Sequence, residues 1–228
     1  MAIRAKNPTW SSVLLMVVVA AVWGWEQWHR PPGEPRAKPT ARTETAAVVN
    51  ASGREGGYER FDGCAWVDDR LNDGDSFKLR LPGGREETFR LYFVDTPESK
   101  FKRYAGGDSN HARIDDQAAY FDGITPEQAV EVGKKAKIFV KALLAKQPFT
   151  IYTRWEDPFG DRRYHAFIRL EDGGAMPWLD ERLVARGFCR IFTKGADLPD
   201  GTPLARHKAH LKELERGAKD GRAGAWAK

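Results

Sequence analysis

The chain has 228 residues, of which 41% are hydrophobic and 30% are charged, and its formal net charge is +5. This composition is typical of one soluble globular domain with extra segments, and it excludes wholesale disorder and a multispan membrane protein. Residues 1–57 have a net charge of +3 and the remaining body only +2. A body so weakly basic must hold any bound phosphate with a local cluster of cations.

The first 30 residues have the features of a targeting segment. Arg4 and Lys6 precede an apolar run from Val13 to Trp25, which is about as long as a short membrane span requires. Tryptophans stand at both ends of the run, as they do at membrane–water boundaries. We expect an uncleaved membrane anchor over residues 1–30, with the body outside the cytoplasm. A cleaved signal peptide and a secreted protein are the alternative, although no good small-x-small cleavage site follows the run.

Residues 31–57 contain several prolines and show no hydrophobic periodicity, which is typical of a flexible linker. The body therefore begins at residue 58 and extends to residue 228. Strand patterns are expected at 64–71, 75–81, 88–95, 148–155 and 163–170. The turn residues Asn72-Asp73-Gly74 join the first two strands as a hairpin.

Three helices are expected in the body. The first covers 125–146, because Thr125, Pro126 and Gln128 form an N-terminal capping pattern before an apolar stripe. The second covers 178–186 and ends at Gly187, and the third covers 203–217. Residues 99–123 are polar without a clear period and are interpreted as a long loop. Five strands followed by helices predict an α+β fold, a small closed β-barrel packed by about three helices.

Two carboxylates occupy positions where apolar residues are expected. Asp75 ends the apolar face of strand 75–81, and Asp95 ends the apolar face of strand 88–95. Such carboxylates need a cation, and Glu98 adds a third acid just past the second strand. Together with a neighbouring carbonyl they form a hard oxygen site that suits Ca²⁺ or Mg²⁺. Taken one segment at a time, the alternative is ordinary turn and strand-end residues.

Arginines lie close to these acids in the sequence. Arg90 is in the same strand as Asp95, and Arg162 and Arg163 precede strand 163–170 after a turn. Guanidinium groups bind phosphate oxygens through paired hydrogen bonds and keep their charge. Arg90 with one of the two later arginines would hold a phosphate against a metal. The alternative for Arg162 and Arg163 is two solvent-facing charges beyond a turn.

These segments resemble a known family. Asp73-Gly74-Asp75-Ser76, the run from Arg90 to Glu98 that ends in Val-Asp-Thr-Pro-Glu, and Asp157-x-x-Gly160 followed by arginine and Ala166 are similar to the motifs of staphylococcal-type thermonucleases. Leu183-Val184-Ala185-Arg186-Gly187 and a closing helix that ends near Trp226 also fit. The resemblance covers about residues 60–227, and the Arg90–Glu98 run is its most specific part.

The resemblance implies a five-stranded OB-fold barrel and a Ca²⁺-dependent phosphodiesterase, an endonuclease acting on DNA and RNA. By motif position, Asp75 and Asp95 would bind Ca²⁺ through their carboxylates and Thr96 through its backbone carbonyl. Glu98 would orient or deprotonate the attacking water, and Asp73 would support the metal site. Arg90 and a second arginine would bind the phosphate and stabilise its developing charge. We expect that second arginine to be Arg163, counted back from Ala166, with Arg162 in reserve.

Other departures from the family pattern concern the substrate. The loop after Glu98 is far longer than the prototype's, and we expect Arg103 and Tyr104 to be candidate contacts. The tyrosines that stack on bases in the prototype are absent, since Thr193 and Gly195 stand near their positions. Phe159 is a candidate aromatic platform in their place.

We expect a monomeric nuclease tethered to the membrane through its N-terminal segment, with DNA or RNA as its partner. A catalytically silent OB-fold module that binds nucleic acid or protein at the cell envelope is the main alternative. A third is delivery to an envelope complex in which hydrolysis is incidental. Cys64 and Cys189 are too few for a four-cysteine zinc site; in an exported protein they would form a disulfide, and otherwise two small buried residues.

Overall fold

The computed structural model describes residues 51–104, 106–158 and 160–227, which belong to one compact unit of the chain. The predicted anchor or signal peptide at 1–30 and most of the predicted linker at 31–57 lie outside these residues. Over the ranges that are described, no helix combines the length and the apolar character that a membrane crossing requires.

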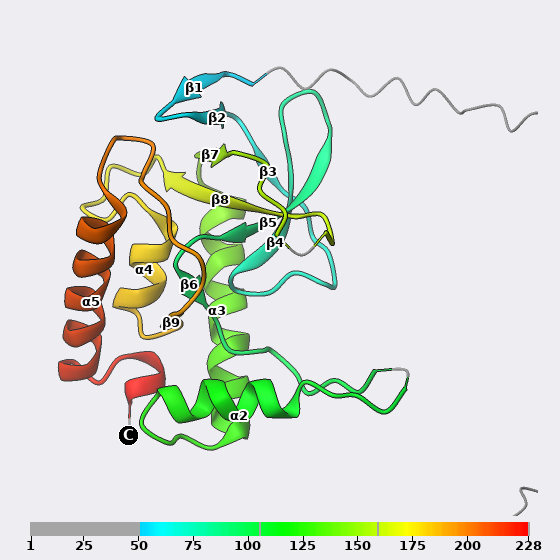
Figure 1. Ribbon diagram of the computed structural model, residues 1–228, viewed down its shortest axis with the longest axis vertical. Coiled ribbons are helices and arrows are strands. Elements are labelled where there is room, and N and C mark those ends of the chain that lie inside the picture. The colour runs from blue at the N-terminus through cyan, green and yellow to red at the C-terminus, as the bar shows by residue number, and fades with distance from the viewer. Residues whose placement is uncertain (1–50, 105, 159, 228) are drawn as a thin grey trace, which may run out of the picture. The chain divides into compact units, whose positions relative to one another are not determined.

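The larger sheet of the described residues has seven strands (Figure 1). Across the sheet they are β1 (Gly53–Glu55), β2 (Tyr58–Phe61), β7 (Phe149–Thr153), β8 (Arg163–Leu170), β5 (Glu86–Leu91), β4 (Ser76–Arg80) and β3 (Ala65–Trp66). Every neighbouring pair is antiparallel except β5 and β8, which run parallel. A second sheet pairs β6 (Val94–Asp95) with β9 (Arg190–Ile191).

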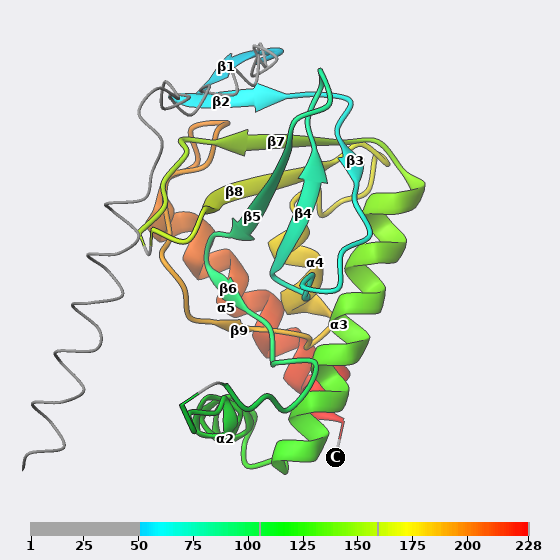
Figure 2. The same ribbon diagram turned by 90° about the vertical axis from the view of Figure 1, so that its right-hand side faces the viewer.

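Four helices accompany the sheets in the described part of the chain. They are α2 (His111–Tyr120), α3 (Pro126–Lys146), α4 (Leu179–Ala185) and α5 (Leu204–Asp220), followed by the short 3-10 helix η1 (Gly224–Trp226). Helix α3 runs along one flank of the sheet toward α2, and α4 packs against α5 and β8 (Figures 1 and 2). The α+β class predicted from the sequence is confirmed.

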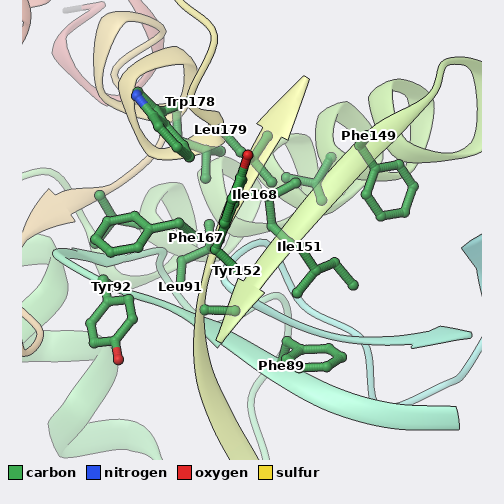
Figure 3. Packing of buried hydrophobic residues seen from close by; sticks show 14 of the residues in the cluster. Phe89, Leu91, Tyr92, Phe149, Ile151, Tyr152, Phe167, Ile168, Trp178 and Leu179 are labelled. Carbon is green, nitrogen blue, oxygen red and sulfur yellow. The ribbon is translucent and has the colours of Figure 1, made fainter. Parts of the chain in front are cut away.

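The apolar core lies between the sheet and the helices (Figure 3). Phe89, Tyr92 and Phe167 are at most 2% exposed. The rings of Tyr92 and Phe167 stack with their centroids 4.7 Å apart. Helix α4 closes the core with Leu179, next to Trp178. Cys64 and Cys189 are both buried and both free, so the described cysteines form no disulfide.

The predicted closed barrel is not seen in the hydrogen-bond pattern. All five predicted strands are present, but β1 and β2 extend the sheet, and no ladder joins β3 to either of them within the described residues. Strands β2 and β3 are separated only by residues 62–64, where Gly63 has φ +67°. This left-handed turn interrupts what would otherwise be one long strand. Strand β1 falls inside the range predicted as linker.

The predicted strand 88–95 is also interrupted. Strand β5 ends at Leu91, and Asp95 belongs to β6 in the other sheet, where it pairs with Arg190. Between them Phe93 has φ +66°, an uncommon conformation for a large side chain, and its ring is buried. The strand alternation used to place Asp95 therefore does not run through this point, although Asp95 is buried all the same.

Helix α2 is the main element that the sequence interpretation missed, because residues 99–123 were expected to be a loop. Asn110 occupies its N-cap position but makes no capping hydrogen bond. The Asn110 side chain instead donates to the Lys100 carbonyl and accepts from the Lys102 amide. Asn is a common N-cap residue, but the N3 position holds Arg113 in place of the glutamate or glutamine of a capping box, so the start signal in the sequence is weak.

Gly133 sets the distance between α3 and the chain at Pro97 and Glu98. A Cβ at this position would lie 2.3 Å from the Pro97 carbonyl oxygen and 2.6 Å from that of Glu98. We expect Gly133→Ala to lower the free energy of unfolding by about 1–3 kcal/mol, because backbone has to move. Gly217→Ala in α5 is the matched control: nothing lies within 4 Å of its Cβ position, and we expect no loss. Urea unfolding of both variants checks this, and equal stabilities would contradict it.

Candidate functional site

A pocket of about 330 Å³ contains most of the residues that the sequence analysis selected. Those lining it are Asp73, Asp75, Arg90, Thr96, Glu98 and Arg163. Asp95 lies against it, 1% exposed, and lines an adjoining pocket of about 360 Å³. A larger hollow of about 570 Å³ lies between the start of α3 and η1 but contains none of these residues. Buried charges make the smaller pocket the candidate site.

Asp95 is surrounded by cationic donors. Its Oδ1 accepts from Nη2 of Arg90 at 2.9 Å and from Nη2 of Arg113 at 2.6 Å. Its Oδ2 accepts from Nε2 of Gln117 at 3.0 Å and from Nε of Arg190 at 2.8 Å. Burial opposes ionisation, but these donors, Arg113 first, hold the pKa of Asp95 below its usual value. Both carboxylate oxygens are thus fully engaged by protein.

Asp75 is less fully engaged. Its Oδ2 accepts from the Thr96 amide at 3.0 Å and lies 3.4 Å from Nη2 of Arg90. In the described part of the chain, no hydrogen bond reaches its Oδ1, and Asp75 lines the pocket. Burial raises the pKa of Asp75; Arg90 opposes this shift, and Asp95 adds to it.

Asp73 completes the acidic side of the pocket. Its Oδ1 accepts from the Gly74 amide at 3.1 Å. Burial, followed by the carboxylates of Asp75 and Glu98, raises the pKa of Asp73 to about 7. A divalent cation beside these three carboxylates would oppose that shift.

Glu98 lies at the rim of the pocket with its side chain 15% exposed. Its Oε2 accepts from Nζ of Lys102 at 3.0 Å and from Nδ2 of Asn110 at 3.3 Å. Its Oε1 lies 3.2 Å from Nε of Arg113. Three side chains thus orient this carboxylate toward the pocket that it lines.

The parallel pairing of β5 with β8 separates the two candidate arginines. It sets Arg163 opposite Thr88, so Arg163 lines the pocket with Arg90. Arg163 is 39% exposed and pairs with Asp161, Nε to Oδ2 2.7 Å. Arg162 has φ +60°, is 75% exposed and lies 3.5 Å from Glu87. Arg162 lines neither pocket, and Phe159 lies outside the described residues.

Three residues that the sequence analysis did not select contact Asp95: Arg113 and Gln117 of α2, and Arg190 of β9. Gln117 is fully buried and also bonds the Thr96 carbonyl and the Glu98 amide, each at 3.0 Å. The four-residue spacing of Arg113 and Gln117 places both on one helix face, a signal that the loop interpretation hid. The loop residues expected to reach the site, Arg103 and Tyr104, are exposed and line neither pocket.

The adjoining pocket of about 360 Å³ shares Arg90, Arg113 and Arg163 with the first. Thr193 lines it, and its hydroxyl donates to the Val94 carbonyl at 3.2 Å. Gly195 instead packs against the Phe93 ring. No aromatic ring replaces the absent tyrosines at these two positions, but Phe192 lines the same pocket and is 65% exposed.

A hard divalent cation would need several oxygen donors from this pocket. Among the residues that the structure describes, no three His, Cys, Asp or Glu side chains have the arrangement of a metal site. Oδ1 of Asp75 and the Thr96 carbonyl are nevertheless oxygen donors of the kind Ca²⁺ prefers. The Asp95 carboxylate could bind the same ion only after one of the four side chains that donate hydrogen bonds to it moves away. The chemistry of the donor set therefore fits, with Asp95 as its conditional member.

Comparison with known proteins adds one distant relative. An uncharacterized protein of Methanocaldococcus jannaschii is 27% identical over 163 residues, which cover 69% of this chain and 69% of that protein. No family model matches the sequence. The chain is thus similar to a protein whose name assigns no activity, and function has to be argued from the site.

Proposed function

We propose that the chain is a calcium-dependent nuclease of the staphylococcal thermonuclease type, which hydrolyses phosphodiester bonds of DNA or RNA. One observation carries the proposal: a single pocket brings together Asp75, Arg90, Glu98 and Arg163 from separate segments of the chain. Guanidinium groups beside carboxylates in one pocket suit a substrate that carries a phosphodiester anion and a cation that bridges the two.

In this proposal Arg90 and Arg163 bind the phosphate oxygens and stabilise the charge that develops on them. Glu98 orients the attacking water and accepts its proton, since its carboxylate is already aligned by Lys102 and Asn110. Asp75, the Thr96 carbonyl and Asp95 would hold Ca²⁺, with Asp73 beside them. The bound ion supplies Lewis-acid stabilisation of the phosphate and helps to place the water.

We also propose the OB-type topology as the finer description of the fold. It is supported by the stretch 58–66, which pairs with β7 through β2 and with β4 through β3. One short segment thus forms hydrogen bonds with both β7 and β4, which are not neighbours in the sheet. Tethering of a monomeric body outside the cytoplasm by residues 1–30 remains part of the proposal and rests on the sequence pattern alone.

A catalytically silent OB-fold module that binds nucleic acid or protein is the second candidate. The observation that favours it is the complete engagement of Asp95 by Arg90, Arg113, Arg190 and Gln117. Such a network would be a structural ion cluster in a binding module, with no requirement for metal.

Cleavage of end-labelled single-stranded DNA by the full-length chain, in Ca²⁺ and then in excess chelator, separates the two candidates. We expect cutting only in Ca²⁺. Arg163→Gln should lower the cleavage rate by about 10²–10³-fold, the usual loss for one transition-state donor. Arg162→Gln, the neighbouring arginine outside the pocket, should stay within about twofold of the parent. Cutting that survives the chelator would refute the calcium site, and DNA binding without cutting in any divalent metal would favour the silent module.

A further inference from the structure

The Arg113 guanidinium bridges two acids of the candidate site. Its Nη2 lies 2.6 Å from Oδ1 of Asp95 and its Nε lies 3.2 Å from Oε1 of Glu98. Arg113 comes from α2, in the segment that is long compared with the prototype of the resembled family. This cation therefore occupies oxygens that the proposed function assigns to metal binding and to the attacking water.

Of the four donors to Asp95, only Arg113 is free to leave at low cost. The side chains of Arg90 and Arg190 are 9% and 7% exposed, and Gln117 is fully buried. Moving any of these three would strand a buried polar group. The Arg113 side chain is 42% exposed, so its charge is solvated when it swings away.

The helix that carries Arg113 has a separate attachment to the site. Gln117 bonds Asp95, the Thr96 carbonyl and the Glu98 amide, and its side chain lies one turn along α2 from Arg113. The Arg113 side chain can therefore move while α2 stays in place. Arg113 lines both pockets, so open space lies beside its guanidinium.

We infer that Arg113 is an internal cation that competes with the divalent metal for Asp95 and leaves when the metal binds. This inference rests on the proposed function, and it makes Arg113 a positioning residue that acts through Asp95 and Glu98. Departure of the one side chain frees Oε1 of Glu98 and, at the same step, vacates one of the two hydrogen-bonding positions on Oδ1 of Asp95, which keeps Arg90. Oδ1 of Asp95 then has an open position for Ca²⁺, and Oε1 of Glu98 is open for the water.

Calorimetric titration of the full-length protein with CaCl₂ tests this without measuring cleavage. Arg113→Met should bind Ca²⁺ about fivefold more tightly than the parent, the scale expected on removing one half-exposed ion pair. Arg113→Lys, which keeps the charge, should bind much like the parent. Arg163→Met is the matched control, because Arg163 lines the same pocket with 39% exposure but pairs with Asp161. It should change the affinity by less than twofold.

The variant keeps three donors on Asp95 and two on Glu98, so it should fold, and its circular dichroism spectrum checks this. Equal tightening in Arg113→Met and Arg163→Met would overturn the inference, because it would reflect the general field of the pocket. Unchanged or weaker affinity in Arg113→Met would also overturn it, and calcium-dependent DNA cleavage by the parent would leave the proposed function standing. Absence of Ca²⁺ binding in the parent and in every variant would overturn both.

Discussion

Replacing Glu98 with glutamine is expected to lower the rate of calcium-dependent DNA cleavage by about 10²–10⁴-fold, the range that a general base contributes. The amide has nearly the shape of the carboxylate, and Lys102 and Asn110 remain beside it as donors. Its oxygen cannot take a proton from water, however, and it lacks the charge that orients one. Single-turnover cleavage of end-labelled DNA by the full-length chain at saturating Ca²⁺ measures the effect.

Glu131→Gln is the control for this experiment. Glu131 is 60% exposed on α3, pairs with Lys134 and lies outside the candidate pocket, so the rate should be unchanged. A Glu98→Gln protein that retains a third of the parent rate would rule out a role for Glu98 in activating water. Equal losses in the two variants would point to a general charge effect.

Asp95→Asn is expected to lower the free energy of unfolding by about 3–5 kcal/mol, the usual cost of removing one partner from a buried ion cluster. Arg90, Arg113 and Arg190 all pair with this carboxylate, and two of them have less than a tenth of their side chain exposed. The amide removes the negative charge and leaves these cations uncompensated. Urea unfolding of the full-length protein at neutral pH, followed by tryptophan fluorescence, gives the difference.

Asp161→Asn is the matched control, since Asp161 also pairs with an arginine of the pocket. That ion pair is 39% exposed on both sides, so its loss should change the free energy of unfolding by less than about 1 kcal/mol. If Asp95→Asn also changed the free energy of unfolding by less than about 1 kcal/mol, water would reach Asp95 and the cluster would not be buried in solution.

The parts of the fold that follow from local physics were predictable. Helix α3 begins where Thr125 and Gln128 predict, because both hydrogen bonds of the capping box form. Five strands lie where alternating apolar residues indicate. The sheet connectivity was not predictable in the same way, since Gly63 and Phe93 both take positive φ and interrupt strands. For Phe93, tertiary packing overrides a preference that the sequence pattern expresses locally.

The candidate site shows the same division. Arg90, Asp95 and Glu98 were identified because charge in or next to an apolar strand is conspicuous. Arg113 and Gln117 were missed for the opposite reason, since polar residues in a polar segment give no such signal. Their helix gains its stability from buried contacts such as those of Ile114 and from Gln117 beneath the site. Neither the capping pattern nor the apolar period of residues 111–120 predicts this.

Arg163 owes its position to the strand behind it. The parallel register that sets Arg163 opposite Thr88 and His165 opposite Arg90 is formed by β8 and β5, whatever the length of the turn that precedes them. Gly160, Asp161 and Arg162 are exposed, so additions among them would lengthen a surface turn and leave the guanidinium where the sheet holds it. The arginine of the pocket is therefore found by counting back along the strand from Ala166. Counting forward from Gly160 in the turn leads to Asp161 instead.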